Sequence, residues 1–151
     1  MSADDRRPVV FCYDGSDGAR RALESSANIL SGQPARVITV WRSAWDEATR
    51  SVALGGIQPD LVEHLDREAE HNGRELAHEG AELVPGSQPV AVKAQGSTWQ
   101  TILDYTDSVH AAAIVVGSRG RGGLRSAILG SVSHGLVNHA HRPVLVVPPE
   151  H

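Results

Sequence analysis

One stretch, from Ala111 to Pro148, limits the fold of this chain more than any other. An unbroken apolar run over 111–116 ends in Gly117, and a loop rich in glycine and arginine follows. Gly130-Ser131 then opens a short amphipathic segment, and a second apolar run covers 144–147. A strand, a glycine loop, a helix and another strand in this order predict a βαβ unit around a candidate phosphate site.

The glycines of this stretch follow the pattern G-x2-G-x9-G-S, formed by Gly117, Gly120 and Gly130-Ser131. Glycines just after a strand let the backbone turn sharply and approach a ligand without interference from a Cβ atom. Gly130 and Ser131 stand where a helix would begin, and the first amides of a helix lack partners and carry partial positive charge. With the hydroxyls of Ser131 and Ser133 as further donors, the pattern predicts a phosphate site, although a plain flexible loop also uses glycines.

Other phosphate and catalytic motifs are absent. A Walker loop needs G-K-[ST], and the only lysine of the chain, Lys93, lies far from this stretch. The dinucleotide pattern G-x-G-x-x-G begins at Gly120, but Arg125 stands where its third glycine belongs. A hydrolase triad built on Ser131 is disfavoured, because neither residue two positions away from this serine is glycine.

The bulk properties favour one domain that binds neither nucleic acid nor membrane. The 151 residues carry a net charge of −4, which argues against a general nucleic-acid or membrane-surface binder. No apolar run approaches the roughly 18–20 residues that cross a bilayer, and the polar start has no signal-peptide core, so a cytoplasmic protein is expected. We expect residues 1–7 to form a flexible tail and residues 8–151 a single domain.

Apolar runs alternate with amphipathic segments along the chain. The apolar runs predict five strands, at 8–13, 36–41, 89–94, 111–116 and 144–147. The amphipathic segments predict four helices, which begin after Ser16 or Asp17, at Pro59, after a cap at Thr98, and at Gly130. The helix that begins at Pro59 should end at about Glu82. Five strands alternating with four helices predict a doubly wound α/β sheet. In such a sheet, ligands bind at the carboxyl ends of the strands.

Two segments carry more specific expectations. Residues 42–58 have no sustained periodicity, and we expect either a mobile cover for the site or a long connection. In the long helix, a stripe of small and apolar residues should face inward, and Gly73 should weaken the middle. This stripe consists of Leu65, Ala69, Leu76, Gly80 and Leu83.

The motif and the chain ends together resemble the universal stress protein family. The likeness runs from the VVFCYDGS segment at 9–16, through G-x2-G-x9-G-S after the fourth strand, to PVLVV at 143–147. The resemblance implies a three-layer, Rossmann-like sandwich with strand order 3-2-1-4-5. It also implies membership of the ATP-binding subgroup, because the glycine motif separates nucleotide-binding members from the others.

The resemblance further implies roles for residues at the strand ends. Asp14 would contact the ribose near a phosphate-bound metal, although an aspartate there can also be a plain turn residue. Backbone groups of Val40 would meet the adenine, although ordinary strand core fits this position equally well. Cys12 and Val116 would supply apolar walls. The full set of expected ATP contacts is Cys12, Asp14, Val40, Val116, Gly117, Gly120, Arg121, Gly130, Ser131, Val132 and Ser133.

The arginine and histidine side chains do not by themselves identify a phosphate or metal site. Arg119, Arg121 and Arg125 could contact phosphate or merely be solvated, and Arg121 is the first choice. His64, His71 and His78 repeat every seven residues, so neighbours on one helix lie about 10 Å apart and cannot share one ion. We expect no metal held by the protein alone, and Mg²⁺ only on the phosphates of ATP.

The sequence therefore favours an ATP-binding stress sensor or regulator rather than a fast enzyme. Asp14 is the only evident general base, so we expect slow ATP hydrolysis at most. A nucleotide-free dimeric interaction module and an ATP-using transferase or pyrophosphatase stay open as alternatives. The apolar strand 144–147 would form a sheet edge, and because family members pair this edge, we expect a homodimer.

Overall fold

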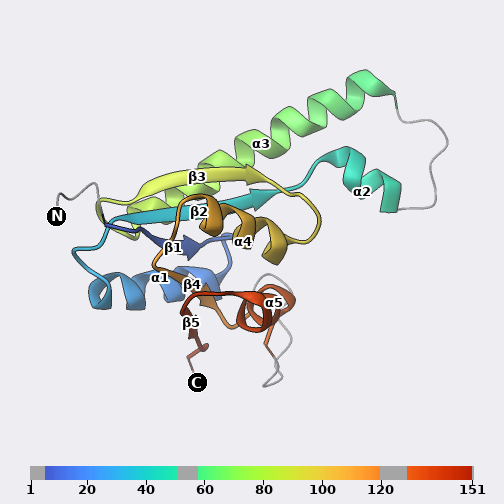
Figure 1. The fold of residues 1–151 in the computed structure, drawn as a ribbon. Helices are drawn as coiled ribbons and strands as arrows, with labels where there is room; N and C mark the ends of the chain where they lie inside the picture. Colours follow the sequence, from blue (N-terminus) through green and yellow to red (C-terminus); the bar gives the residue numbers. More distant parts are fainter. Residues whose placement is uncertain (1–5, 51–57, 120–128, 151) are drawn as a thin grey trace.

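Parallel strands and helices alternate through the computed structural model, which describes residues 6–50, 58–119 and 129–150. The elements in chain order are β1 (Val9–Cys12), α1 (Asp17–Ile29), β2 (Ala35–Trp41), α2 (Ala44–Arg50), α3 (Pro59–Glu82), β3 (Gln88–Lys93), α4 (Thr98–Ser108), β4 (Ala113–Gly117), α5 (Ser131–His139) and β5 (Val144–Val147). All neighbouring strands pair in parallel. The sheet order is β3-β2-β1-β4-β5 (Figure 1), which confirms the expected α/β fold.

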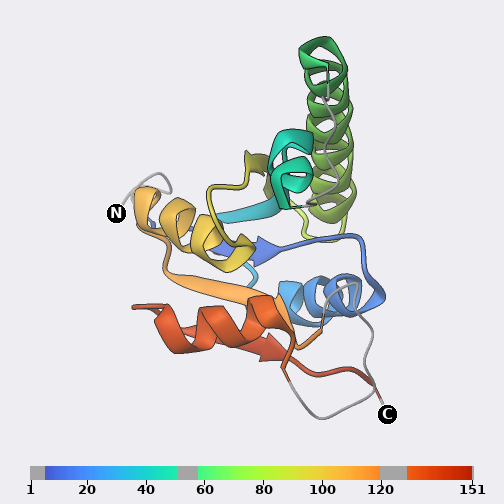
Figure 2. The same ribbon diagram turned by 90° about the vertical axis from the view of Figure 1, so that its right-hand side faces the viewer.

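Two layers of helices enclose the sheet, with α1 and α3 on one face and α4 and α5 on the other (Figure 2). The central strand β1 shows why both layers are needed. Val9 and Phe11 belong to the core beneath α1 and α3, whereas Val10 and Cys12 belong to the core beneath α4 and α5. All four residues are buried, as expected for a strand covered on both faces.

The strand order places a crevice at the end of β1. This strand pairs with β2 on one side and β4 on the other, with Phe11 opposite Val37 and Val115. The connections that leave β1 and β4 turn to opposite faces of the sheet, and an open α/β sheet binds ligands where this reversal occurs. The two candidate segments, which surround residues 14 and 117, therefore meet here.

The segment after β2 is more regular than the sequence predicts, because α2 forms within the 42–58 stretch. A contact from α3 fixes its start. The Asp66 carboxylate accepts hydrogen bonds from Ser43 Oγ at 2.7 Å and from the Ala44 amide at 2.7 Å. The sequence predicted four helices and none over 44–50, and it missed α2 because the side chain that fixes the start of this helix lies far away in sequence.

The inward face of α3 follows the expected stripe toward its carboxyl end, where Gly80 is buried and Leu76 and Leu83 pack against the core. Leu65 is an exception at 38% exposed, and Gly73 and Ala77 are buried although the stripe did not include them. Gly73 allows the close approach of the Trp41 ring, since a Cβ atom there would lie 3.1 Å from Trp41 Cβ. The helix thus packs through small residues, and its amino-terminal half extends past the sheet (Figure 1).

The start of α4 also differs from the expectation. Ser97, not Thr98, is the N-cap, and it forms a capping box with Gln100. Thr98 is the first helical residue, and its hydroxyl accepts a hydrogen bond from Arg42 at 3.0 Å. The predicted cap at the start of α1 is confirmed, because the Ser16 hydroxyl accepts from the Ala19 amide at 3.2 Å.

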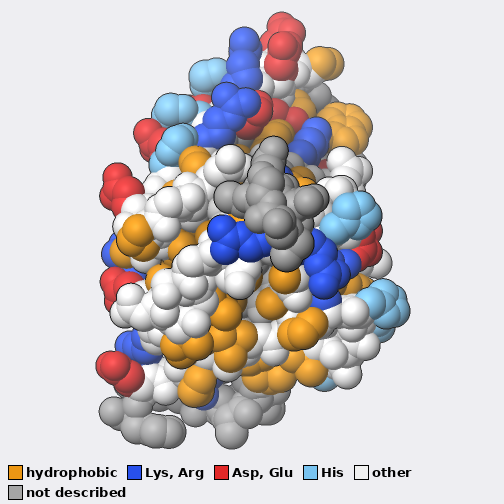
Figure 3. All heavy atoms as spheres, turned by 60° about the vertical axis from the view of Figure 1, so that its left-hand side comes forward, with side chains coloured by type: hydrophobic (Ala, Val, Ile, Leu, Met, Phe, Trp, Pro, Cys, Tyr) orange, Lys and Arg blue, Asp and Glu red, His pale blue; other side chains and the backbone are white. Residues whose placement is uncertain are grey.

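The face of the molecule in Figure 3 shows where charged and hydrophobic side chains gather. Acidic, basic and histidine side chains crowd the upper end of the molecule, where α3 lies, and hydrophobic side chains gather on the lower half of the face shown in Figure 3. Among the described residues, no helix combines the length and the apolar character that crossing a membrane requires.

Candidate functional site

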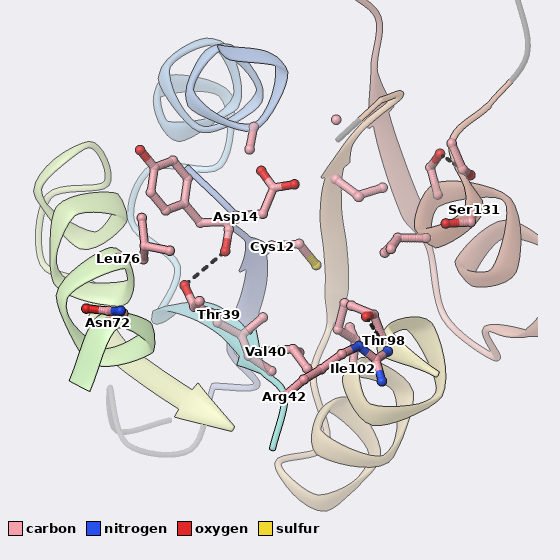
Figure 4. Close-up of a pocket in the computed structure, with 18 of the residues that line it drawn as sticks. Cys12, Asp14, Thr39, Val40, Arg42, Asn72, Leu76, Thr98, Ile102 and Ser131 are labelled. Carbon is pink, nitrogen blue, oxygen red and sulfur yellow. Dashed lines mark hydrogen bonds between the residues drawn. The ribbon is translucent and has the colours of Figure 1, made fainter. Parts of the chain in front are cut away.

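A cavity of about 990 Å³ lies at the carboxyl ends of β1, β2 and β4. The starts of α4 and α5 form its wall on one face of the sheet, and α3 lies on the other (Figure 4). Ala44 and Glu47 of α2 also line it. Its volume lies at the upper end of the usual range for small-molecule sites. Nine of the expected site residues line it, namely Cys12, Asp14, Val40, Val116, Gly117, Gly130, Ser131, Val132 and Ser133. Gly120, Arg121 and Arg125 lie outside the described residues.

The floor of the cavity is apolar. Cys12 and Val116 end adjacent strands, and Val40 and Ile102 extend the same surface. Burial, together with the nearby Asp14 charge, raises the pKa of the Cys12 thiol to about 12. The thiol is therefore neutral at physiological pH and serves as a small hydrophobic group rather than a nucleophile.

Asp14 stands at the turn that follows β1. One of its carboxylate oxygens accepts a hydrogen bond from the Ser16 amide at 2.9 Å, which makes the local turn. The residue also lines the cavity. Both interpretations that the sequence left open are thus compatible, since the carboxylate can shape the turn and face a ligand.

The amino end of α5 supplies hydrogen-bond donors. Helix geometry leaves the amides of Ser131, Val132 and Ser133 without partners inside the helix, and these residues line the cavity. The Gly130 amide donates to the Ser118 carbonyl at 2.7 Å. The Ser133 hydroxyl is already used, because it donates to Ser118 O and Gly130 O at 3.0 Å each. Ser133 thus offers its amide, whereas Ser131 offers an amide and an exposed hydroxyl.

Gly117 lines the cavity, as expected, and it also packs closely against α1. A Cβ atom at this position would lie 3.0 Å from the carbonyl oxygen of Gly18 in α1. In turn, a Cβ atom at Gly18 would lie 2.8 Å from the Arg119 carbonyl. The close packing of β4 against α1 is therefore one structural reason for glycine at position 117.

Several lining residues were not expected from the sequence. Arg42 reaches from the end of β2 to α4, where it donates to Gly96 O at 3.1 Å and to Thr98 Oγ1. Arg119, which the sequence left undecided, also lines the cavity. Glu68 and Asn72 enter from α3, where their helical spacing relative to Leu65 is the signal that could have identified them.

The comparisons with known proteins identify the family. The universal stress protein family model matches residues 5–148. The chain belongs to this family. A universal stress protein of Bacillus subtilis, YxiE, is 28% identical over 143 residues, which cover 92% of this chain and 97% of the relative. A universal stress protein of Thermus aquaticus is 30% identical over 141 residues, which cover 93% of this chain and 98% of the relative.

Solved structures of universal stress proteins share the fold. UspA from Lactobacillus plantarum matches with a TM-score of 0.68 at 23% identity, over 94% of this universal stress protein and 97% of UspA. A universal stress protein in complex with cAMP matches with a TM-score of 0.63 at 21% identity, over 97% and 98% of the two chains. An Arabidopsis thaliana member with AMP bound matches with a TM-score of 0.54 at 19% identity, over 95% and 92%. Relatives of this fold thus bind adenine nucleotides.

Proposed function

We propose that this universal stress protein binds ATP in the cavity and uses its occupancy as a signal, as a sensor or regulator of the stress response. The observation that carries the proposal is the convergence of residues from β1, β2, β4 and α5 on one cavity. The complexes of relatives with cAMP and AMP support an adenine nucleotide as the ligand.

The phosphates would bind at the amino end of α5. The amides of residues 131–133 and the partial positive charge of the helix end suit phosphate oxygens, and the Ser131 hydroxyl adds a donor. Arg119 lines the same cavity and brings a guanidinium group, which suits phosphate. Gly120 and Arg121 stay in the proposed phosphate site on the strength of the sequence motif.

The base and the sugar would occupy the strand ends. The apolar floor formed by Cys12, Val40 and Val116 suits an adenine ring, and the backbone of Val40 would meet its polar edge. Asp14 would contact the ribose and lie near Mg²⁺ carried on the phosphates, since magnesium binds through few carboxylates and substrate oxygens. When bound, the ion would neutralise phosphate charge.

The first test is to identify what the protein carries. Freshly purified protein is denatured, and the released small molecules are separated by ion-exchange chromatography. We expect ATP near one equivalent, or uptake of one equivalent when ATP and Mg²⁺ are added. Turnover should fall well below the roughly 1–1,000 per second of ordinary enzymes. Failure to retain or take up ATP would favour the nucleotide-free interaction module, and fast turnover would favour an enzyme.

We also propose a homodimer that pairs through β5. This strand lies at the edge of the sheet and, among the described residues, pairs only with β4. Its Leu145 side chain is 39% exposed, and Val137 on the adjacent α5 is 49% exposed. An apolar strand edge that stays unpaired invites association, and a second copy would cover it.

The dimer is tested with Leu145→Lys and light scattering at micromolar concentration. We expect the natural protein to have twice the monomer mass and the variant to have the monomer mass, because a lysine on each copy places like charges at the interface. Leu61→Lys is the matched control, since Leu61 is an exposed leucine on α3 and its variant should stay dimeric. A monomeric natural protein would contradict the proposal.

A further inference from the structure

The contact between α4 and α5 contains one close fit that the proposed function leaves unexplained. A Cβ atom at Gly135 of α5 would lie 2.2 Å from Trp99 Cγ and 2.4 Å from Trp99 Cδ1. The indole of Trp99 thus lies directly on the α5 backbone. Gly135 has no side chain to prevent this, and it is buried.

The same indole meets α5 a second time, one turn further along. The rings of Trp99 and His139 stack with their centroids 4.5 Å apart and an interplanar angle of 11°. Residues four apart share one face of a helix, so Gly135 and His139 form a notch that the indole fills. Sliding α5 along its axis toward its amino end would drive the His139 ring into the indole.

The helix that carries Trp99 is firmly anchored. Arg42 bonds to Gly96 O and to Thr98 next to the tryptophan, and the Thr101 hydroxyl accepts from the Gln95 amide at 2.9 Å. Ile102 lies in the core with 2% of its surface exposed. Trp99 is therefore a fixed point against which α5 rests.

Trp99 is one of the supports that hold the amino end of α5. The others are the hydrogen bonds of Gly130 and Ser133, which lead to Ser118 after β4 or stay within this segment, and the packing of Val132 and Leu136 on the core. Gly135 lies four residues from Ser131, which corresponds to about 6 Å along the helix axis. A shift at the notch therefore moves the amides of residues 131–133, which need to lie within hydrogen-bond distance of a phosphate.

We propose that Trp99 is a positioning residue for the phosphate end of the nucleotide site. It acts through Gly135 and His139, which set where the first amides of α5 lie. The inference rests on the proposed function, and it adds that the phosphate part of the affinity is set by a side chain that does not line the cavity. The base and ribose part, which depends on β1, β2 and β4, is independent of Trp99.

The test compares ATP with adenosine, which lacks the phosphates, by calorimetric titration of the full chain. We expect Trp99→Ala to weaken ATP binding about tenfold, which is the loss of about one hydrogen bond to a charged group, and to leave the affinity for adenosine unchanged. Trp99→Phe should restore part of the ATP affinity. Trp45→Ala is the matched control, because it removes another tryptophan, exposed on α2, and should change neither affinity.

His139→Ala gives a second measurement that does not depend on removing the indole. His139 is exposed, so its replacement should leave the fold intact. We expect the affinity for ATP to fall a few-fold and the affinity for adenosine to stay unchanged. The positioning role is overturned if a variant loses affinity for ATP and for adenosine equally. It is also overturned if both Trp99→Ala and His139→Ala leave the affinity for ATP unchanged. If the natural protein bound neither ligand, the proposed function itself would fail, which is a distinct result.

Discussion

Replacing Ser131 with aspartate is expected to abolish most ATP binding while leaving the fold as stable as before or slightly more stable. Ser131 is the first residue of α5 and is exposed beside the cavity. A carboxylate in the first turn stabilises a helix by about 0.3–1 kcal/mol. The same charge repels a triphosphate, and we expect a loss of about 1.4–2.8 kcal/mol, which is tenfold to hundredfold in affinity.

The Ser131→Asp variant should lose affinity for ATP without losing stability, so a damaged fold cannot explain the result. Affinity for ATP is measured by calorimetry, and the free energy of unfolding by urea titration. Ser131→Asn is the control, because asparagine has the same size without the charge, and it should retain most of the affinity. Adenosine should bind the aspartate variant normally. Unchanged ATP affinity in Ser131→Asp would show that the phosphates do not bind at the amino end of α5.

Replacing Gly80 with alanine is expected to destabilise the protein, although alanine normally favours a helix. A Cβ atom at Gly80 would lie 2.8 Å from Tyr13 Cγ and Cδ1 and 2.8 Å from Val37 Cγ1. Tyr13 is 3% exposed and Val37 is fully buried, so neither can move aside. Overpacking lowers the free energy of unfolding by about 1–3 kcal/mol, and the preference of alanine for a helix raises it by at most about 1 kcal/mol. We therefore expect a net loss of about 1–2 kcal/mol in the free energy of unfolding.

Thermal unfolding followed by circular dichroism measures this loss. For a chain of this length, it corresponds to a Tm lower by about 2–8 °C. Gly73→Ala on the same helix is the control, because its Cβ contact with Trp41 is looser, at 3.1 Å. Because this contact is less tight and alanine favours a helix, we expect the Gly73 variant to lose less stability than the Gly80 variant. If the Gly80 variant were as stable as the natural protein, the close packing of α3 on β1 and β2 would be contradicted.

The sequence predicted the strands and the strand ends well, because local patterns produce them. Buried parallel strands appear as short apolar runs, and the serine before α1 is a local cap signal. The family resemblance added the sheet order, which no local pattern contains. The convergence of residues 14 and 117 on one cavity followed from that order.

The parts that the sequence did not predict depend on contacts between distant residues. The start of α2 depends on Asp66 in α3, and the reach of Arg42 to α4 depends on the packing of β2 beside that helix. Gly117 was predicted as a ligand contact and lines the cavity, but its close approach to Gly18 in α1 was not predicted. A glycine pattern alone does not distinguish a close helix from a close ligand.

The assembly of the cavity from both ends of the chain links ligand binding to the folding equilibrium. Its walls come from β1 near the amino terminus and from α5 near the carboxyl terminus, so no fragment of the chain contains the whole site. A ligand that binds only the assembled cavity stabilises the entire domain, by about 2.7 kcal/mol at a free concentration of 100 times Kd. The lifetime of the folded protein would then rise and fall with the nucleotide supply of the cell.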